Sequence, residues 1–139
     1  MTRMKLKNLI VGLLLLVTFS ACKSAFPDAK WTNKQWTVVE MLGVPVQTSN
    51  TPQDAHLIFN AREKMVSGSG SCNRVFGPYE MGKRNNLKFG NLASTMMACQ
   101  NLEFENKFME TLKTVESYEV VEGELLLKNK KMEVILKLR

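Results

Sequence analysis

The chain has 139 residues, of which 45% are hydrophobic and 23% are charged, a balance that excludes a disordered chain and fits one globular domain. Three positive charges, Arg3, Lys5 and Lys7, lie within residues 1–21, so the formal net charge of +6 falls to +3 for the rest of the chain. Because this excess is small and no basic stripe is interleaved with aromatic residues, we expect no nucleic-acid partner.

Residues 1–21 have the pattern of an export signal. The basic residues are followed by an apolar run over residues 8–19, which is shorter than the roughly 20 residues that a membrane-spanning helix needs. Polar sequence follows at once. The segment therefore predicts a cleaved signal peptide and not a membrane anchor.

The end of this segment predicts lipidation. Phe19-Ser20-Ala21-Cys22 is similar to a lipobox, in which small residues precede the cysteine whose thiol accepts a diacylglyceryl group. Acyl chains on Cys22 would anchor the protein firmly, with residues 22–31 as a tether. We expect a membrane-anchored lipoprotein of the cell envelope, on the outer membrane or the periplasmic face. The alternative is that the protein is secreted without a lipid and that Cys22 is not modified.

Residues 32–139 are predicted to form one β-rich domain. Runs of β-branched and bulky residues predict short strands at Trp36–Leu42, His56–Phe59, Lys64–Ser67, Val75–Tyr79, Leu87–Phe89, Leu125–Leu127 and Met132–Leu138. Residues 43–45 and 50–52, which contain glycine and proline, predict a polar loop, and residues 60–63 predict a turn.

One segment has the period of a helix. Phe104, Phe108, Leu112 and Val115 recur at spacings of 4, 4 and 3, and Asn101 is the expected N-cap. We expect this stripe to be buried against the sheet rather than to bind a partner. Many short strands with one helix predict an α+β fold, in which a curled antiparallel sheet or open pseudo-barrel is capped by one α-helix.

The C-terminal hairpin shows strand alternation. In its second arm we expect Met132, Val134, Leu136 and Leu138 to share the buried face, although Ile135 breaks the pattern. We expect the lysines of the hairpin tip to be solvated and not to bind an anionic surface. These lysines are Lys128, Lys130 and Lys131.

The middle of the chain contains two linked motifs. Residues 68–79 read Gly-Ser-Gly-Ser-Cys-Asn-Arg-Val-Phe-Gly-Pro-Tyr, and residues 94–99 read Ser-Thr-Met-Met-Ala-Cys. This pair resembles the META domain of HslJ-like heat-shock lipoproteins. The resemblance implies an envelope protein linked to envelope maintenance or to stress and antibiotic tolerance, without a catalytic activity. Ser71 stands where the family usually has glycine, so a positive φ there would strain it.

Cys72 and Cys99 are the remaining cysteines. Outside the cytosol such a pair indicates a disulfide, which would close a loop of about 28 residues and stabilise the fold by about 3.5 kcal/mol. Two buried free thiols remain an alternative. A metal site would need about four ligands, and only His56 could join the thiolates, so we expect no metal and no cofactor.

Four polar residues of the motifs are candidates for a patch that contacts a ligand or an envelope protein. They are Asn73, Arg74, Tyr79 and Thr95. The alternative is structural: asparagine and threonine satisfy backbone groups at turns, and tyrosine buries its ring with its hydroxyl bonded.

Catalysis has little support in the sequence. Ser69 lacks the Gly-x-Ser-x-Gly spacing of a hydrolase, the chain has one histidine, His56, and there is no Cys-x-x-Cys motif. We expect no catalytic residue and a non-enzymatic protein. A second hypothesis is an accessory or inhibitory module for an envelope protein, which would need an exposed apolar patch.

Overall fold

The computed structural model describes residues 30–100 and 102–139. Their elements, in chain order, are β1 (Gln35–Met41), β2 (Val44–Pro45), β3 (His56–Asn60), β4 (Met65–Ser69), β5 (Arg74–Met81), β6 (Leu87–Phe89), β7 (Ala93–Ser94), α2 (Leu102–Lys113), β8 (Ser117–Val121), β9 (Glu124–Lys128) and β10 (Val134–Leu138). No helix among these residues is long and apolar enough to cross a bilayer. The predicted signal peptide, Cys22 and the N-cap Asn101 lie outside the described residues.

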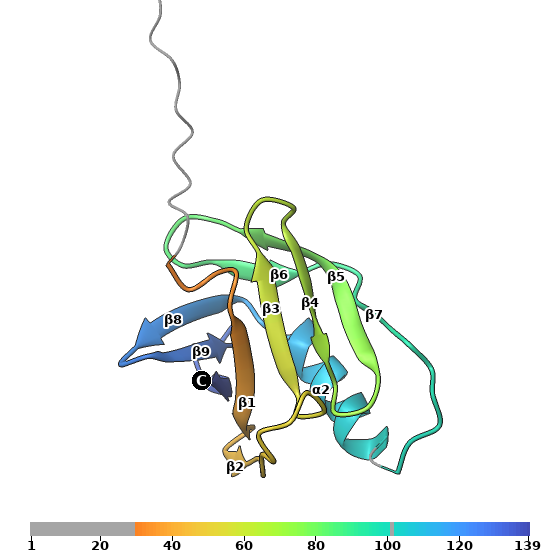
Figure 1. Cartoon of the computed structure of the whole chain (residues 1–139). Helices are drawn as coiled ribbons and strands as arrows, with labels where there is room; N and C mark the ends of the chain where they lie inside the picture. Colours follow the sequence, from red (N-terminus) through yellow and green to blue (C-terminus); the bar gives the residue numbers. More distant parts are fainter. Residues whose placement is uncertain (1–29, 101) are drawn as a thin grey trace, which may run out of the picture.

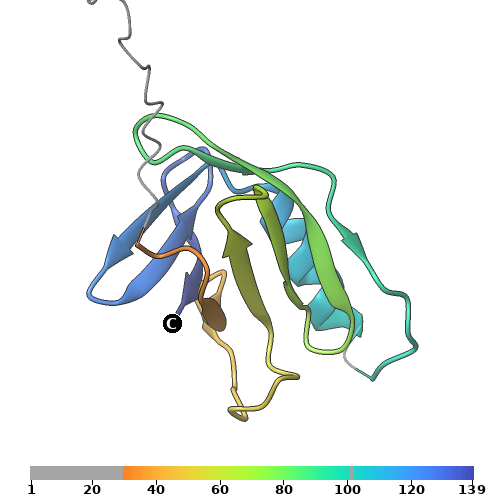
Figure 2. The same ribbon diagram turned by 45° about the horizontal axis from the view of Figure 1, so that its top comes forward.

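The strands form one antiparallel sheet in the order β6-β5-β4-β3-β1-β10-β9-β8, with β2 paired to β1 and β7 to β5. The sheet curls until its two outer strands approach each other (Figures 1 and 2). They meet at one bridge, Asn86–Ser117, and the sheet remains open elsewhere. The predicted α+β fold with a curled, open antiparallel sheet is confirmed.

The helix α2 lies behind the β3-β4-β5 part of the sheet (Figure 1). Phe108 and Leu112 are fully buried, and Val115 is buried just beyond the helix end. Phe104 is partly buried and stacks on Phe108, with ring centroids 6.3 Å apart. The predicted burial of the helix stripe is confirmed, and the hydrophobic effect fixes the helix to the sheet.

Aromatic rings from β3, β5, β8 and the segment before β1 fill one end of the core. The ring of Phe59 lies 4.9 Å from that of Trp31 and 5.3 Å from that of Tyr79, both nearly edge to face. Tyr118 lies 4.7 Å from Trp31. The indole of Trp36 donates to the carbonyl of Trp31 over 2.7 Å. These contacts attach the start of the described chain to the sheet.

The predicted face of the last strand is only half correct. Leu136 and Leu138 are buried, but Met132 and Val134 are exposed and Ile135 is buried. The pairing of β10 with β9 shifts register between Val134 and Leu136. Such a bulge puts two consecutive residues opposite one, and it turns Ile135 into the core.

Three strands were not predicted: β2, where a loop was expected, β7 and β8. Each has exposed residues on both faces or is only two residues long, so pairing rather than hydrophobic pattern defines it. The turn between β3 and β4 covers residues 61–64 and not the expected 60–63, because Asn60 pairs with Met65 and because Lys64, with φ 53°, lies in the turn. At the last hairpin tip, Lys130 and Lys131 are exposed, whereas Lys128 is half-buried and pairs with Glu119.

Candidate functional site

The two sequence motifs meet where β4 turns into β5. The loop between them is tight: the Gly70 amide donates to the carbonyl of Asn73 over 2.8 Å, and the Ser71 amide donates to Ser69 Oγ over 3.1 Å. Ser71 has φ 90°, a backbone conformation that favours glycine. The strain predicted for a serine at this position is therefore present.

Glycine at position 70 permits a close approach of the helix to this loop. A Cβ atom added to Gly70 would lie 2.6 Å from Cγ of Glu105, which is inside van der Waals contact. The absence of a side chain therefore lets the Glu105 carboxylate reach the loop backbone.

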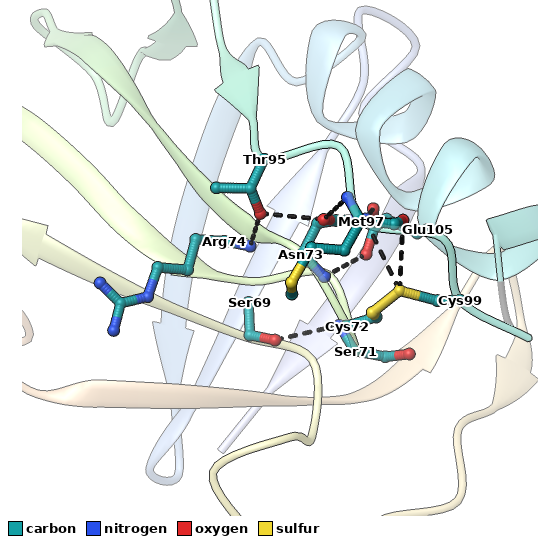
Figure 3. The surroundings of a disulfide bond; sticks show 9 residues. All are labelled: Ser69, Ser71, Cys72, Asn73, Arg74, Thr95, Met97, Cys99 and Glu105. Carbon is teal, nitrogen blue, oxygen red and sulfur yellow. Dashed lines mark hydrogen bonds between the residues drawn. A yellow bond between two sulfur atoms is a disulfide. The ribbon is translucent and has the colours of Figure 1, made fainter.

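Asn73 is the centre of the site (Figure 3). Its side chain is 1% exposed. Its amide oxygen accepts from Thr95 Oγ1 over 2.9 Å and from the Met97 amide over 2.7 Å. Its amide nitrogen donates to Glu105 Oε1 over 2.7 Å and to the Met97 carbonyl over 3.3 Å. Both donors and both acceptor positions of the side chain are thus occupied by the protein itself.

Glu105 is a carboxylate buried beneath this loop, with 4% of its surface exposed. Its second oxygen accepts from the Asn73 backbone amide over 2.8 Å. Glu105 lies in the first turn of α2, where the helix dipole favours a negative charge. Because its two oxygens are held by one residue, Glu105 and Asn73 depend on each other.

The motif at residues 94–99 closes over Asn73 from the other side. The Thr95 amide donates to the Arg74 carbonyl over 3.0 Å, and Thr95 Oγ1 accepts from the Arg74 amide over 3.0 Å. A disulfide joins Cys72 to Cys99, with Cα atoms 6.3 Å apart. Of the states predicted for this cysteine pair, the structure therefore has the bridge, which ties the segment after β7 to the β4–β5 loop.

Arg74 and Tyr79 do not face Asn73 and Thr95 together. The Arg74 guanidinium points away from the network (Figure 3) and is exposed. Tyr79 is buried in the aromatic cluster, where its hydroxyl donates to the Asn60 carbonyl over 3.2 Å and burial raises the pKa of its phenol above the ordinary 10.0. The structure thus brings together two of the four predicted patch residues, Asn73 and Thr95.

A hollow of about 650 Å³ opens beside the disulfide, within the size range of small-molecule sites. Ser71 and Gln100, the neighbours of the two cysteines, contribute to its wall. Apolar surface comes from Met41, Val46 and Phe104. This hollow was not predictable from local sequence patterns, because its walls come from segments far apart in the chain: β1 with the loop that follows it, the β4–β5 loop, and α2 with Gln100.

The side chains of the remaining candidates, His56 and Ser69, bond to nearby backbone groups. His56 is partly buried, and its Nδ1 lies 2.8 Å from the Asp54 carbonyl oxygen. Ser69 is buried and accepts from the Ser71 amide. Within residues 30–100 and 102–139, no three histidine, cysteine, aspartate or glutamate residues form a group that could hold a metal ion.

Comparison with known protein families shows to which family this chain belongs. The sequence pattern of the META domain matches residues 29–139. The chain belongs to the META domain family. The predicted resemblance is confirmed, and a search of curated proteins finds no matching sequence.

Solved structures share the fold. A protein solved by NMR is 25% identical, with a TM-score of 0.60, over 78% of this chain and 89% of that chain. A DUF4847 family protein from Bacteroides vulgatus is 15% identical, with a TM-score of 0.61, over 78% and 93%. A Burkholderia xenovorans protein is 18% identical, with a TM-score of 0.57, over 77% and 81%. The last two likenesses concern the fold alone.

The two META motifs of this chain therefore have a structural role. Its Cys-Asn pair and its Thr-Met-Met-Ala-Cys segment are the two halves of one hydrogen-bonded and disulfide-linked network. Glu105, the third partner, lies outside both sequence motifs, in the first turn of α2. Its pairing with Asn73 could not be predicted, because 31 residues separate them.

Proposed function

We propose that this META domain is a non-enzymatic binding module, held in the bacterial cell envelope by a lipid on Cys22, that serves envelope maintenance or tolerance of stress and antibiotics. The observation that carries the proposal is the saturation of Asn73. Every hydrogen-bonding position of its side chain is taken by Thr95, Met97 and Glu105. The most polar cluster of the signature thus builds the fold and has no free group for chemistry.

The hollow beside the disulfide is the surface that we assign to binding. It combines apolar walls with amide and charged groups, among them Gln47, Gln100 and Lys107. Apolar walls with a few polar groups are the usual composition of a small-ligand or peptide site. Such a site requires no nucleophile or general base.

The lipid anchor is tested by mass spectrometry of the N-terminal peptide from protein purified from membranes. We expect a peptide that begins at Cys22 and carries acyl chains. The Cys22→Ser variant should leave the membrane fraction or retain its signal peptide. An intact Met1 with an unmodified thiol at position 22 would refute the anchor.

The binding role is tested in a deletion strain that expresses variants during envelope stress. Val44, on the wall of the hollow, is 61% exposed, and Val120, on β8, is 43% exposed. We expect Val44→Asp to lower stress survival and Val120→Asp to leave it unchanged, although both add the same charge. Equal effects of the two variants would refute a role for the hollow.

An accessory or inhibitory module for an envelope protein is the second candidate. The observation that favours it is the side chain of Met96, which is 96% exposed beside the half-exposed Met97. Methionine side chains adapt to protein surfaces. We expect Met96→Gln to lose a stoichiometric partner in pull-downs from solubilised membranes, whereas Met132→Gln, another exposed position, should retain it. A partner retained by both variants would argue against this surface.

A further inference from the structure

The end of the domain at which the described chain begins is basic. Lys30 is exposed there, and the chain then runs along the turn between β3 and β4. The Asn33 amide donates to the Phe59 carbonyl over 2.8 Å, and Asn33 Oδ1 accepts from the Ala61 amide over 3.3 Å. Residues 61–64 therefore lie beside the segment that leads to the predicted tether.

A second turn, residues 82–86 between β5 and β6, lies at the same end. The Tyr118 amide donates to the Asn85 carbonyl over 2.9 Å, and the Tyr118 ring contacts that of Trp31. Both views of the ribbon place this turn close to the point where the described chain starts (Figures 1 and 2). We call the charged residues of these three segments the basic end: Lys30, Arg62, Glu63, Lys64, Lys83 and Arg84, all exposed.

The charge of the domain is concentrated at this end. Residues 30–139 contain 15 basic and 12 acidic residues, a net charge of +3. The basic end has five basic residues and one acidic residue, a net charge of +4, so the rest of the domain carries −1. Glu80, on the adjacent part of β5, lowers the local sum to +3. Within the described part of the chain, Lys30, Arg62, Lys83 and Arg84 form no ion pair.

The length of the tether confines this end to the membrane. Seven residues, 23–29, lie between Lys30 and the cysteine predicted to be acylated, so eight Cα-to-Cα steps join the two. Even a fully extended chain of that length spans only about 29 Å. The basic end is thus held near the headgroups at high local concentration, whereas the hollow lies at the opposite end of β3, beside Asp54 and Ala55.

We propose that the basic end rests on the headgroups of anionic lipids and so orients the domain with its hollow away from the membrane. The inference rests on the proposed lipid anchor. A surface potential of about −30 mV attracts each Lys or Arg at the surface, with about a threefold enrichment per positive charge. The other end lies beyond the reach of this field, because it decays over about 8–10 Å, less than the length of a five-residue strand.

The test measures lysine acetylation in the full lipoprotein, reconstituted into vesicles of phosphatidylcholine alone or mixed with phosphatidylglycerol. An anionic surface raises the local proton concentration about threefold and lowers the uncharged amine in proportion. With an uncharged reagent, we expect phosphatidylglycerol to slow acetylation of Lys83 about threefold and to leave Lys107 unchanged. High salt should abolish the difference.

Two matched double variants complete the experiment. Arg62→Gln with Arg84→Gln should remove most of the slowing at Lys83, whereas Arg74→Gln with Arg139→Gln, outside the basic end, should retain it. Equal slowing at Lys83 and Lys107, or loss of the effect in both variants, overturns the inference. The mass of the N-terminal peptide separates the two proposals: an acylated Cys22 without lipid dependence refutes only the orientation, and a free Cys22 refutes the anchor and the orientation together.

Discussion

Two ends of the same sheet are stabilised in different ways. Beside the β4–β5 loop, Asn73, Glu105 and Thr95 form a closed set of hydrogen bonds with a disulfide over it. At the opposite end, the rings of Phe59 and Tyr79 pack edge to face, with one hydroxyl bonded to the backbone. Hydrogen bonds need one geometry, whereas apolar contacts tolerate small changes in shape. The comparison therefore predicts that the polar end is the more sensitive to substitution.

The largest effect is expected from Asn73→Ala. It removes the side-chain amide that donates to Glu105 Oε1 and that accepts from Thr95 Oγ1 and the Met97 amide, and it leaves Glu105 with only the backbone amide of residue 73. Buried polar and charged groups then lack partners, which should cost about 3–5 kcal/mol of unfolding free energy. Urea denaturation measures the loss. Asn91→Ala, at an exposed position, is the control and should change stability little. A loss below about 1 kcal/mol at position 73 would contradict the central role of this amide.

Loss of the disulfide is expected to lower the unfolding free energy nearly as much as Asn73→Ala. Replacing Cys72 and Cys99 together by serine reopens a loop of about 28 residues and should lower the unfolding free energy by about 3.5 kcal/mol. Guanidinium denaturation of this variant and of reduced wild-type protein should give the same loss. If oxidised and reduced wild-type protein are equally stable, the bridge does not stabilise the fold.

A smaller effect is expected at the aromatic end. Phe59→Leu keeps an apolar side chain in the core but loses the ring contacts, so it should cost about 1–2 kcal/mol. Thermal unfolding measures the change, and Phe76→Leu, at a half-exposed position, is the matched control. A cost as large as that of Asn73→Ala would remove the contrast between the two ends.

Tyr79→Phe tests the hydroxyl of the aromatic end. Loss of the bond to the Asn60 carbonyl should cost about 1 kcal/mol below pH 10. Because the pKa of Tyr79 is raised in the folded state, wild-type stability is full below the ordinary value and falls as pH rises through the raised pKa. The variant should lose this alkaline fall, whereas Tyr118→Phe should keep it. Parallel pH profiles for wild type and Tyr79→Phe would contradict the assignment.

The smallest expected effect is an increase in stability. Ser71→Gly relieves the positive φ of the β4–β5 loop and should stabilise the protein by about 0.5–1 kcal/mol, after the entropy cost of glycine in the unfolded chain. Ser67→Gly, inside β4, should destabilise it by a similar amount. Chemical denaturation measures both. A loss of stability in Ser71→Gly would show that the serine side chain is needed in the loop.

The sequence by itself determined the fold class, the family and most of the short strands. Local patterns were sufficient for these, because glycine and proline separate the strands and the stripe of Phe108 and Leu112 has a helical period. The positive φ of Ser71 was also predictable, since the family usually has glycine there. These features depend on residues that are close in the chain.

Only the tertiary structure decided which residues act together. Glu105 reaches Asn73 from α2 because Gly70 leaves room for it, and no local pattern encodes that approach. The bulge that buries Ile135 arises from pairing with β9. The hollow and the basic end likewise combine distant segments. Curling of the sheet sets these neighbours, and contacts across such distances in sequence follow from packing rather than from propensity.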